Sequence, residues 1–380
     1  MIGPDAPRAP PLGAVLGLFS AGFIGWTLLL GAHGGSYADY LSEWREILAG
    51  HDPWRPAAGL PFNAYGPLFN ALAALAAVHP LAPKVLFALA YCGFAWWLIA
   101  RIWPARAPGL YPWPLILLCL ANPYVWISVA HFGMFDVLAG LAAVAGVHLA
   151  GQGRAMRAGA ALAAGILLKL VPLVILPFLV IGRGQIGPRL ALACAGVTLA
   201  GFTLSYLIWG PSTFAPFTFA GTRGPVHSVY ILVGADQPEL AAWLSRAALA
   251  AMGLALICWC TLRRTDPALS ALMAVLGTLL FYQVGYNNYQ MMLLPLAAYW
   301  LTLNWVQLRQ QRGLLSVFAA YFISLALIDM LFPVLRRVLA QPLAFALLDA
   351  LCLLRFAAGC ALLLALARYS PPRGRARVQP

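Results

Sequence analysis

The feature that most constrains the fold is the recurrence of long apolar segments along the whole chain. A helix of about 20 apolar residues crosses the hydrocarbon core of a bilayer. Hydrophobic residues make up 62% of the 380 residues and charged residues only 9%, which is too apolar for a soluble protein. Apolar segments lie at roughly 12–32, 84–102, 112–128, 134–150, 188–209, 239–262, 268–283, 289–306, 314–333 and 343–367. We therefore expect an all-α, polytopic integral membrane protein with a single domain over 1–380.

Two shorter or interrupted segments, 66–79 and 158–181, decide how the loops are distributed. The second contains Lys169 and Pro172, which a membrane helix tolerates only where the break lines a cavity. If both segments enter the membrane and return, nearly every basic cluster lies in the cytoplasm, as the positive-inside rule requires. The clusters are Arg101 with Arg106, Arg154 with Arg157, Arg183 with Arg189, Arg263 with Arg264, Arg309 with Arg312, and the tail 368–380, whereas Arg336 and Arg337 violate the rule. The sequence predicts about 10–12 transmembrane or re-entrant helices.

This arrangement also accounts for the net charge of +13. In a soluble protein such a charge would suggest nucleic acid, but here the arginines lie in short loops, so membrane lipids are the expected partners and nucleic acid is not. The first apolar segment lacks a small-residue cleavage site and is expected to be a retained helix. The seven cysteines form no CxxC pair and are expected to be buried as small apolar residues. No His/Cys metal cluster and no phosphate-binding glycine loop is present, so no metal or cofactor is predicted.

Acidic residues concentrate in the first polar passage, the external loop 33–66. Four of the chain's eleven acids, Asp39, Glu43, Glu46 and Asp52, lie there. Residues Tyr37 to Leu48 form an amphipathic pattern typical of a helix on the bilayer surface, with the acids on one arc. Those acids could simply solvate the outer face, which is the expectation for Glu43 and Glu46. Asp39 begins the helix against the membrane, so it could instead face inward and act as a catalytic base.

A second polar group is expected where two apolar helices meet, in NPYVWISVAHFGMFD. Asn122, His131 and Asp136 lie there, and an acid in such a setting usually faces a polar cavity. Asp136 could equally cap a helix or accept a structural hydrogen bond, and His131 could be structural. Lys169, inside an apolar segment, needs an anionic ligand group or a buried acid as partner, unless it extends to the surface.

Two later polar passages complete the candidates. In the external loop 210–238, Arg223 and His227 could hold a phosphate, or could be incidental charges of a mobile loop. In QVGYNNYQ, Asn287, Asn288 and Gln290 could bind sugar hydroxyls, or could simply be hydrated. The last two apolar segments contain Asp329, Asp349 and Arg355, which are interpreted as structural pairs.

The order of these motifs resembles the GT-C superfamily of glycosyltransferases. The closest resemblance is to bacterial polyprenol-phosphate-mannose-dependent mannosyltransferases and to relatives that build glycosyl-phosphatidylinositol anchors. It rests on GHDPW followed by NAYGPLF, on NP followed by HFGMFD, and on the helix that runs into Lys-x-x-Pro, within Gly34 to Pro177. Counting back from Gly50, the family's leading acid would fall at Ser36, three residues before Asp39.

The resemblance implies an inverting transfer of a sugar from a polyprenyl-phosphate donor to a lipid or glycan acceptor on the external side, with mannose as the family's usual sugar. Asp39 would be the base and Asp136 the acid of the second loop. Lys169 would be the basic residue before the proline, and with Arg223 and His227 it is expected to bind the donor phosphate. The residues expected to contact substrate are Glu43, Tyr65, Asn122, His131, Asn287, Asn288 and Gln290.

Two other functions compete with the transferase. Broken helices with polar residues also mark the substrate pathways of lipid-linked-sugar flippases and other transporters, although no duplicated pair of interrupted helices is evident. A catalytically inactive membrane assembly factor is the third possibility. Arginine in excess of lysine, alanine-rich helices and the lack of eukaryotic sorting signals indicate a bacterial inner membrane, with the active site facing the periplasm.

Overall fold

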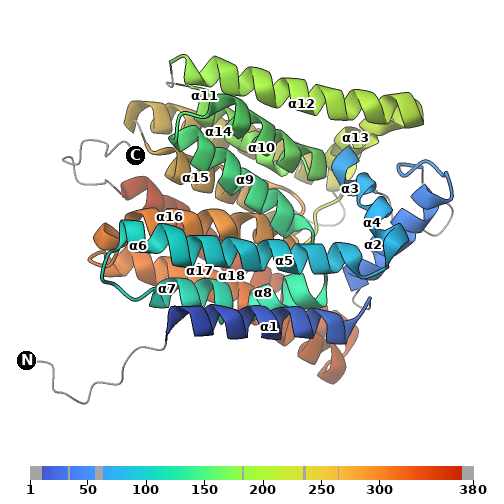
Figure 1. Cartoon of the computed structure of the whole chain (residues 1–380). Coiled ribbons are helices and arrows are strands. Elements are labelled where there is room, and N and C mark those ends of the chain that lie inside the picture. The colour runs from blue at the N-terminus through green and yellow to red at the C-terminus, as the bar shows by residue number, and fades with distance from the viewer. Residues whose placement is uncertain are drawn as a thin grey trace, which may run out of the picture.

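The computed structural model describes residues 11–32, 35–55, 63–181, 184–233, 237–263 and 265–369, and for 220–222 only the backbone. These residues form helices packed side by side with their axes roughly parallel and antiparallel (Figure 1). Within the described ranges no β-sheet forms, and one isolated bridge joins Val226 and Val284. The all-α prediction is confirmed. Arg183, Arg264, parts of the acidic loop and the tail after Tyr369 lie outside the described residues.

Eight helical stretches of the described chain are long and apolar enough to cross a membrane. They are α1 (Leu12–Leu30); α5 (Ala82–Trp96) with η1 (Trp97–Ile102) and α6 (Trp103–Arg106); α7 (Trp113–Leu115) with η2 (Ile116–Leu120), α8 (Pro123–Val125) and η3 (Trp126–His131); α12 (Ile186–Trp209) with η5 (Gly210–Phe214) and α13 (Ala215–Thr222); α14 (Pro238–Arg263); η7 (Asn287–Met292) with α16 (Leu293–Leu308); α17 (Arg312–Val338); and α18 (Gln341–Arg368). The chain is a multi-pass membrane protein.

Shorter apolar helices fill the spaces between these spans. They are α3 (Pro67–Ala71), α4 (Ala73–Val78), α9 (Asp136–Gly151), α10 (Ala155–Leu168), η4 (Val171–Ile175), α11 (Leu176–Val180) and α15 (Pro267–Phe281). The predicted interruption of 158–181 is confirmed, because α10 ends before Lys169 and a 3-10 turn over Val171–Ile175 follows. A Cβ on Gly187 would lie 2.4 Å from the Val180 carbonyl oxygen, so the end of α11 packs against the start of α12. Segment 158–181 therefore runs along α12 as α10 and then turns back, as α11, toward the start of α12.

The two ends of the bundle are formed by different helices (Figure 1). At one end lie α6 and the starts of α10 and α12, with Arg106, Arg154 and Arg189. At the opposite end lie α2 (Gly35–Leu48), α3, α4 and α13. We call this second end the site end, because the polar motifs singled out above lie there. The side walls are apolar: Leu18 in the middle of α1 is 76% exposed and Leu254 in the middle of α14 is 65% exposed, as suits contact with lipid chains.

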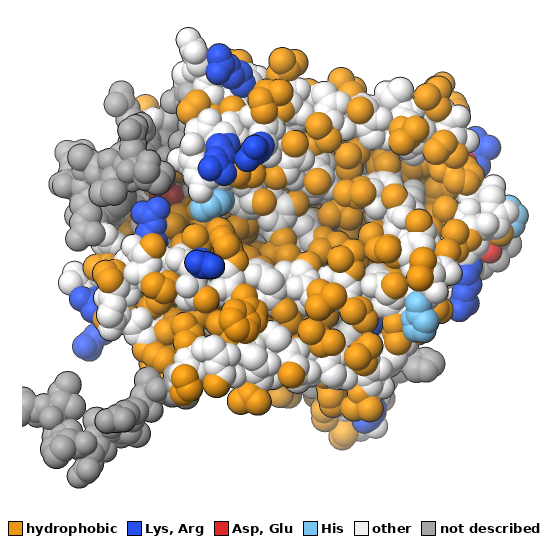
Figure 2. Space-filling view, in the orientation of Figure 1, with side chains coloured by type: hydrophobic (Ala, Val, Ile, Leu, Met, Phe, Trp, Pro, Cys, Tyr) orange, Lys and Arg blue, Asp and Glu red, His pale blue; other side chains and the backbone are white. Residues whose placement is uncertain are grey.

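Small residues let the central helices approach closely. A Cβ on Gly140 would come within 2.8 Å of the Met292 carbonyl oxygen, and one on Gly159 within 2.4 Å of the Leu190 carbonyl oxygen. Such contacts are typical of helix packing in membranes, where small residues bring backbones together. Figure 2 shows hydrophobic side chains over most of one face, with a recess between α10 and α5. Both α10, at its end, and α5, at its start, meet the site end, so the recess leads there.

Candidate active site

A buried ion pair lies at the centre of the site end. Lys169 donates a hydrogen bond to Asp136 Oδ1 at 2.5 Å, and the two residues are 9% and 0% exposed. Asp136 occupies the first turn of α9, and Lys169 has the extended backbone that follows α10. The start of α3 is tied to the same break, since the Gly66 N–H donates to the Leu168 carbonyl. Lys169 was expected to pair with an anionic ligand group or a buried acid unless it extended to the surface, and the structure shows the buried acid, Asp136.

Aromatic rings surround this pair. The Lys169 ammonium lies 3.6 Å from the centroid of the Tyr289 ring, and 5.7 and 5.8 Å from those of Phe135 and Tyr65. Tyr40 on α2 joins the same cluster, with its centroid 5.6 Å from that of Tyr65 and 5.5 Å from that of Phe135. Cation–π contacts of this kind stabilise a cation that has left water. The rings thus form a rigid, amphipathic wall around the charged groups.

Three hydrogen-bond acceptors at the site end are buried and have no partner within the described structure. They are Glu43 Oε2, Asp136 Oδ2 and Asn288 Oδ1. Met134 lies near two of them, because Asn288 Nδ2 is 3.7 Å from its sulfur and Asp136 follows two residues later; Tyr40 Oη also lies 3.7 Å from that sulfur. An unsatisfied buried acceptor costs about 1–3 kcal/mol. Three of them in one region indicate a ligand that carries several hydroxyl donors.

The two leading acids of α2 have the opposite orientation to the one expected. Asp39 is exposed and Glu43 is only 7% exposed, so the prediction that Asp39 faces inward is wrong. Tyr37, Tyr40 and Trp44 are buried, and Glu43 lies on their side of the helix. Burial raises the pKa of the Glu43 carboxyl to about 8, with a further contribution from the nearby charge of Asp39. Partial burial also raises the pKa of Asp39. Glu46, as expected, lies toward solvent and pairs with His51.

A second cation, Arg223, approaches the pair from the loop after α13. Its guanidinium donates to the hydroxyl of Tyr289 at 3.2 Å and to that of Tyr286 at 3.4 Å. Among the described residues no carboxylate forms an ion pair with it. Arg223 and Lys169 therefore contact the two ends of one tyrosine, Arg223 at its hydroxyl and Lys169 at its ring. Two cations around a single carboxylate leave positive charge available to an anion.

Several other predicted site residues form hydrogen bonds within the protein. Asn122 caps α8 by accepting from the Tyr124 N–H. His227 pairs with Asp349 at 3.1 Å, Asn287 donates to Asp329 at 2.6 Å, and Gln290 accepts from Tyr321 at 2.7 Å. His131 ends η3, and among the described residues it forms no hydrogen bond with the central pair. The structure therefore brings together Glu43, Tyr65, Asp136, Lys169, Arg223 and Asn288.

Sequence reasoning missed Tyr40, Met134 and Phe135. Tyr40 was counted as part of an apolar arc, and Met134 and Phe135 lie between Gly133 and Asp136 as ordinary apolar residues. The sequence did contain a signal: Met134 and Phe135 directly precede Asp136, the first residue of α9, so they lie next to a candidate site residue. The described residues bring together no group of three His, Cys, Asp or Glu side chains that could hold a metal ion. That no metal is needed stays a prediction.

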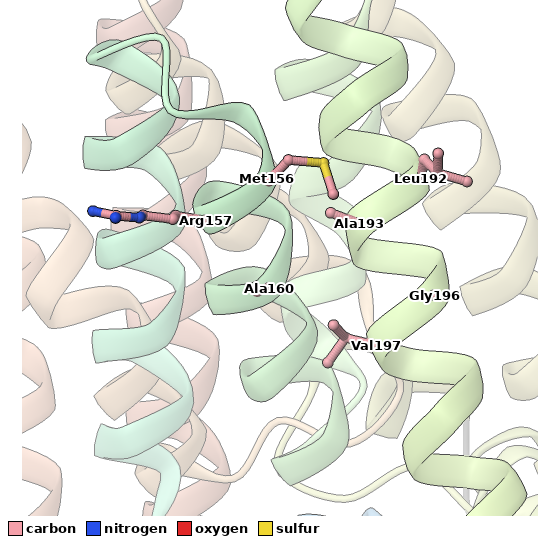
Figure 3. Close-up of a pocket in the computed structure, with 7 residues that line it drawn as sticks. All are labelled: Met156, Arg157, Ala160, Leu192, Ala193, Gly196 and Val197. Atoms are coloured by element: carbon pink, nitrogen blue, oxygen red, sulfur yellow. The ribbon is translucent and has the colours of Figure 1, made fainter.

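A shallow groove of about 460 Å³ lies elsewhere, between α10 and α12 (Figure 3). Apolar and small residues line it, and Arg157 points away from α12. None of the candidate site residues contributes to its lining, which is Met156, Arg157, Ala160, Leu192, Ala193, Gly196 and Val197. A groove with this lining suits a lipid chain, and the polar chemistry lies at the site end.

Residues 63–284 match the model of glycosyltransferase family 87, which is more than half of the chain. The chain belongs to glycosyltransferase family 87. A search of the curated proteins found no match. The region that identifies this family 87 glycosyltransferase includes Tyr65, Asp136, Lys169 and Arg223, whereas α2 and Asn288 lie outside it.

Membership in family 87 favours an enzyme over a transporter. The protein is a membrane glycosyltransferase, so its substrates are a sugar donor and an acceptor, and membrane lipids surround it. The cluster at the site end fits these substrates, because its partnerless acceptors suit sugar hydroxyls and its two cations suit an anionic leaving group.

Proposed function

We propose that this family 87 enzyme transfers a sugar, with mannose as the first candidate, from a polyprenyl-phosphate donor to a lipid or glycan acceptor. The reaction takes place at the site end, facing the periplasm of a bacterial inner membrane, and inverts the anomeric carbon, as in the GT-C enzymes that the sequence resembles. One observation carries the proposal. Three partnerless buried acceptors lie at the same end of the bundle as two cations and a wall of aromatic rings, and one of them, Asp136 Oδ2, belongs to the partner of Lys169.

The donor phosphate binds at Lys169 and Arg223. Lys169 is neutralised in part by Asp136, and Arg223 has no carboxylate partner in the described structure, so an incoming phosphate gains charge-assisted hydrogen bonds. The recess between α10 and α5 gives the prenyl chain an apolar path to the same end (Figure 2). As the sugar leaves, negative charge grows on the phosphate, and prearranged cations stabilise that charge.

Glu43 is the general base. Its carboxylate takes the proton from the acceptor hydroxyl, the hydroxyl oxygen bonds to the anomeric carbon, and the bond from that carbon to the phosphate oxygen breaks. The prenyl phosphate departs with the electron pair, and a single displacement inverts the configuration. A buried carboxyl whose pKa lies near the working pH suits this task. Asp136, through its partnerless Oδ2, accepts a hydrogen bond from a donor-sugar hydroxyl.

Asp39, the base implied by the resemblance, has a different part in this proposal. It lies one helical turn before Glu43, and its charge contributes to the raised pKa of Glu43. Asp39 therefore adjusts the base. If Asp39 itself deprotonates the acceptor, activity is lost in Asp39→Asn and kept in Glu43→Gln.

Matched acid-to-amide variants on α2 test the proposal. Purified protein in proteoliposomes receives radiolabelled polyprenyl-phosphate mannose and membrane lipid acceptors. We expect labelled product with the wild type and with Asp39→Asn, and its loss in Glu43→Gln at unchanged thermal stability. Product with Glu43→Gln but not with Asp39→Asn would restore Asp39 as the base. Label that crosses the vesicle membrane without product would favour the flippase.

A further inference from the structure

A second buried polar network joins the last two helices to the site end. Arg355 on α18 is 4% exposed and donates from Nη1 to Asn287 Oδ1 at 3.2 Å. Asn287 in turn donates to Asp329 Oδ1 on α17 at 2.6 Å. Ser128 donates to the other oxygen of Asp329 at 3.4 Å, and Tyr124 to the Asn287 carbonyl at 2.8 Å. One asparagine thus connects a buried guanidinium with a buried carboxylate.

Arg355 also holds two backbone segments together. Its Nη2 donates to the carbonyls of His227 and Gly285, at 3.1 and 2.6 Å. These carbonyls belong to the two segments that form the isolated bridge of Val226 with Val284. The Gly285 N–H donates to the Val226 carbonyl, which closes the bridge from the other side. A single side chain therefore clamps the crossing of two loops that come from distant parts of the sequence.

The clamped backbone is strained. His227 has φ of 50°, the one left-handed non-glycine residue among those described. A conformation of this kind costs of order 1 kcal/mol or more and persists only where the surroundings enforce it. Both enforcing contacts come from α18: Arg355 binds the His227 carbonyl, and Asp349 binds its ring. Strain held in place by one helix indicates that the loop geometry matters for function.

The crossing determines where Arg223 lies. Gln283, directly before the bridge, donates to the Arg223 carbonyl at 2.5 Å, and Val226 donates to the Gln283 carbonyl at 3.1 Å. Tyr286 and Tyr289, which follow Gln283 on the same segment, accept the two hydrogen bonds of the Arg223 guanidinium. Both the backbone of Arg223 and the acceptors of its side chain are thus fixed to the crossing that Arg355 clamps.

We propose that Arg355 is a positioning residue for the donor phosphate site, and that the last two helices act on catalysis through it. It touches neither sugar nor phosphate; it aligns Arg223 and Tyr289 with the phosphate by holding the crossing of 226–228 with 283–287. This inference rests on the proposed role of Arg223 in donor binding.

The test compares Arg355→Lys, Arg223→Met and their combination, with donor KM, acceptor KM, kcat and melting temperature measured for each. Lysine keeps the charge but cannot reach three acceptors at once. We expect Arg355→Lys to raise donor KM about tenfold, as fits the loss of a charged hydrogen-bond network, with acceptor KM unchanged. In the Arg223→Met background the same change should add less than about twofold, because the residue through which Arg355 acts is already gone.

A pair of glycines supplies a test without any change of charge. A Cβ on Gly285 would lie 2.4 Å from the His227 carbonyl oxygen, whereas one on Gly224 in the same loop would meet nothing within 4 Å. Gly285→Ala should raise donor KM, and Gly224→Ala should leave it at the wild-type value. These variants decide the matter if Arg355→Lys does not fold.

The outcomes separate the two proposals. If Arg223→Met raises donor KM but Arg355→Lys and Gly285→Ala do not, Arg355 is structural only and the inference fails by itself. Equal effects of Arg355→Lys in both backgrounds would also overturn it. If Arg223→Met leaves donor KM unchanged, the proposed phosphate site is wrong, and the role of Arg355 fails with it.

Discussion

Replacing Glu43 by glutamine removes one ionisable group from the inner face of α2 and should abolish a specific pH dependence. With a pKa of about 8, about a tenth of the Glu43 carboxyls are ionised at pH 7 and about nine tenths at pH 9. If the ionised form is the base, kcat/KM of the wild type rises about tenfold between these pH values. Glu43→Gln should lose a factor of about 10² to 10⁴ in kcat and show no rise.

Asp39→Asn provides the matched control. Its charge raises the pKa of Glu43, so its removal should shift the rising part of the profile to lower pH while activity persists. The assay is the initial rate of label transfer in detergent from pH 6 to 9.5, at donor concentrations well below KM. A flat wild-type profile would refute the assignment of Glu43. The same rise in Glu43→Gln would show that another group titrates.

The same carboxyl makes stability depend on pH. Its folded-state pKa of about 8 lies above the ordinary value of 4.5, so the folded protein holds the proton more tightly than the unfolded chain. The stabilisation is therefore complete below about pH 4.5 and is lost as pH rises through about 8, with an upper limit of about 5 kcal/mol. The melting temperature of the wild type should fall relative to that of Glu43→Gln over this range. A constant difference would contradict the burial of an ionisable group there.

Two further predictions concern the surroundings of Lys169, and a third concerns the packing of α2 against Gly133. Lys169→Met leaves Asp136 as an unpaired buried charge and should destabilise the protein by about 3–5 kcal/mol. The double variant Lys169→Met/Asp136→Leu should recover most of that loss. Equal melting temperatures for the single and the double variant would contradict this prediction. Tyr289→Phe keeps the ring over Lys169 but removes the hydroxyl that accepts a hydrogen bond from Arg223. Donor KM should therefore rise about three- to tenfold with little change in melting temperature. An unchanged donor KM would show that the Arg223–Tyr289 hydrogen bond does not contribute to donor binding. Gly133→Ala should lower the melting temperature by several degrees, because Gly133 has φ of 61° and its Cβ would lie 2.6 Å from a tyrosine of α2; wild-type stability would show that α2 can move aside.

The sequence predicted the helices well because apolar segments in a membrane have few alternatives. All backbone groups must be satisfied within the segment, so composition and length determine the spans. The interruption at Lys169 was predictable for the same reason, since a lysine and a proline cannot continue an apolar helix without cost. The helix over Gly35–Leu48 followed from its amphipathic period.

The orientation of α2 was not predictable in the same way. The helical wheel placed Asp39, Glu43 and Glu46 on one arc, but only the packing of Tyr37, Tyr40 and Trp44 determines which edge of that arc faces the protein. Likewise, Asn122 and Asn287 look like ligand-binding residues in the sequence, and only the structure shows the cap and the network that occupy them. A polar residue in an apolar segment needs a hydrogen-bond partner, and the sequence does not show whether that partner is a ligand or another group of the protein.

Polar groups gather at the site end because helices stop there. An uninterrupted membrane helix satisfies its own backbone and presents an apolar surface, so it offers a sugar little to bind. At the site end, α9 begins at Asp136, α10 breaks before Lys169, and the loops around Arg223 and Tyr289 cross. Each of these discontinuities frees one polar side chain, and α2 adds Glu43 from outside the bundle. The proposed base on α2 and the proposed phosphate-binding cations, Lys169 and Arg223, therefore come from different elements that meet at this end of the bundle.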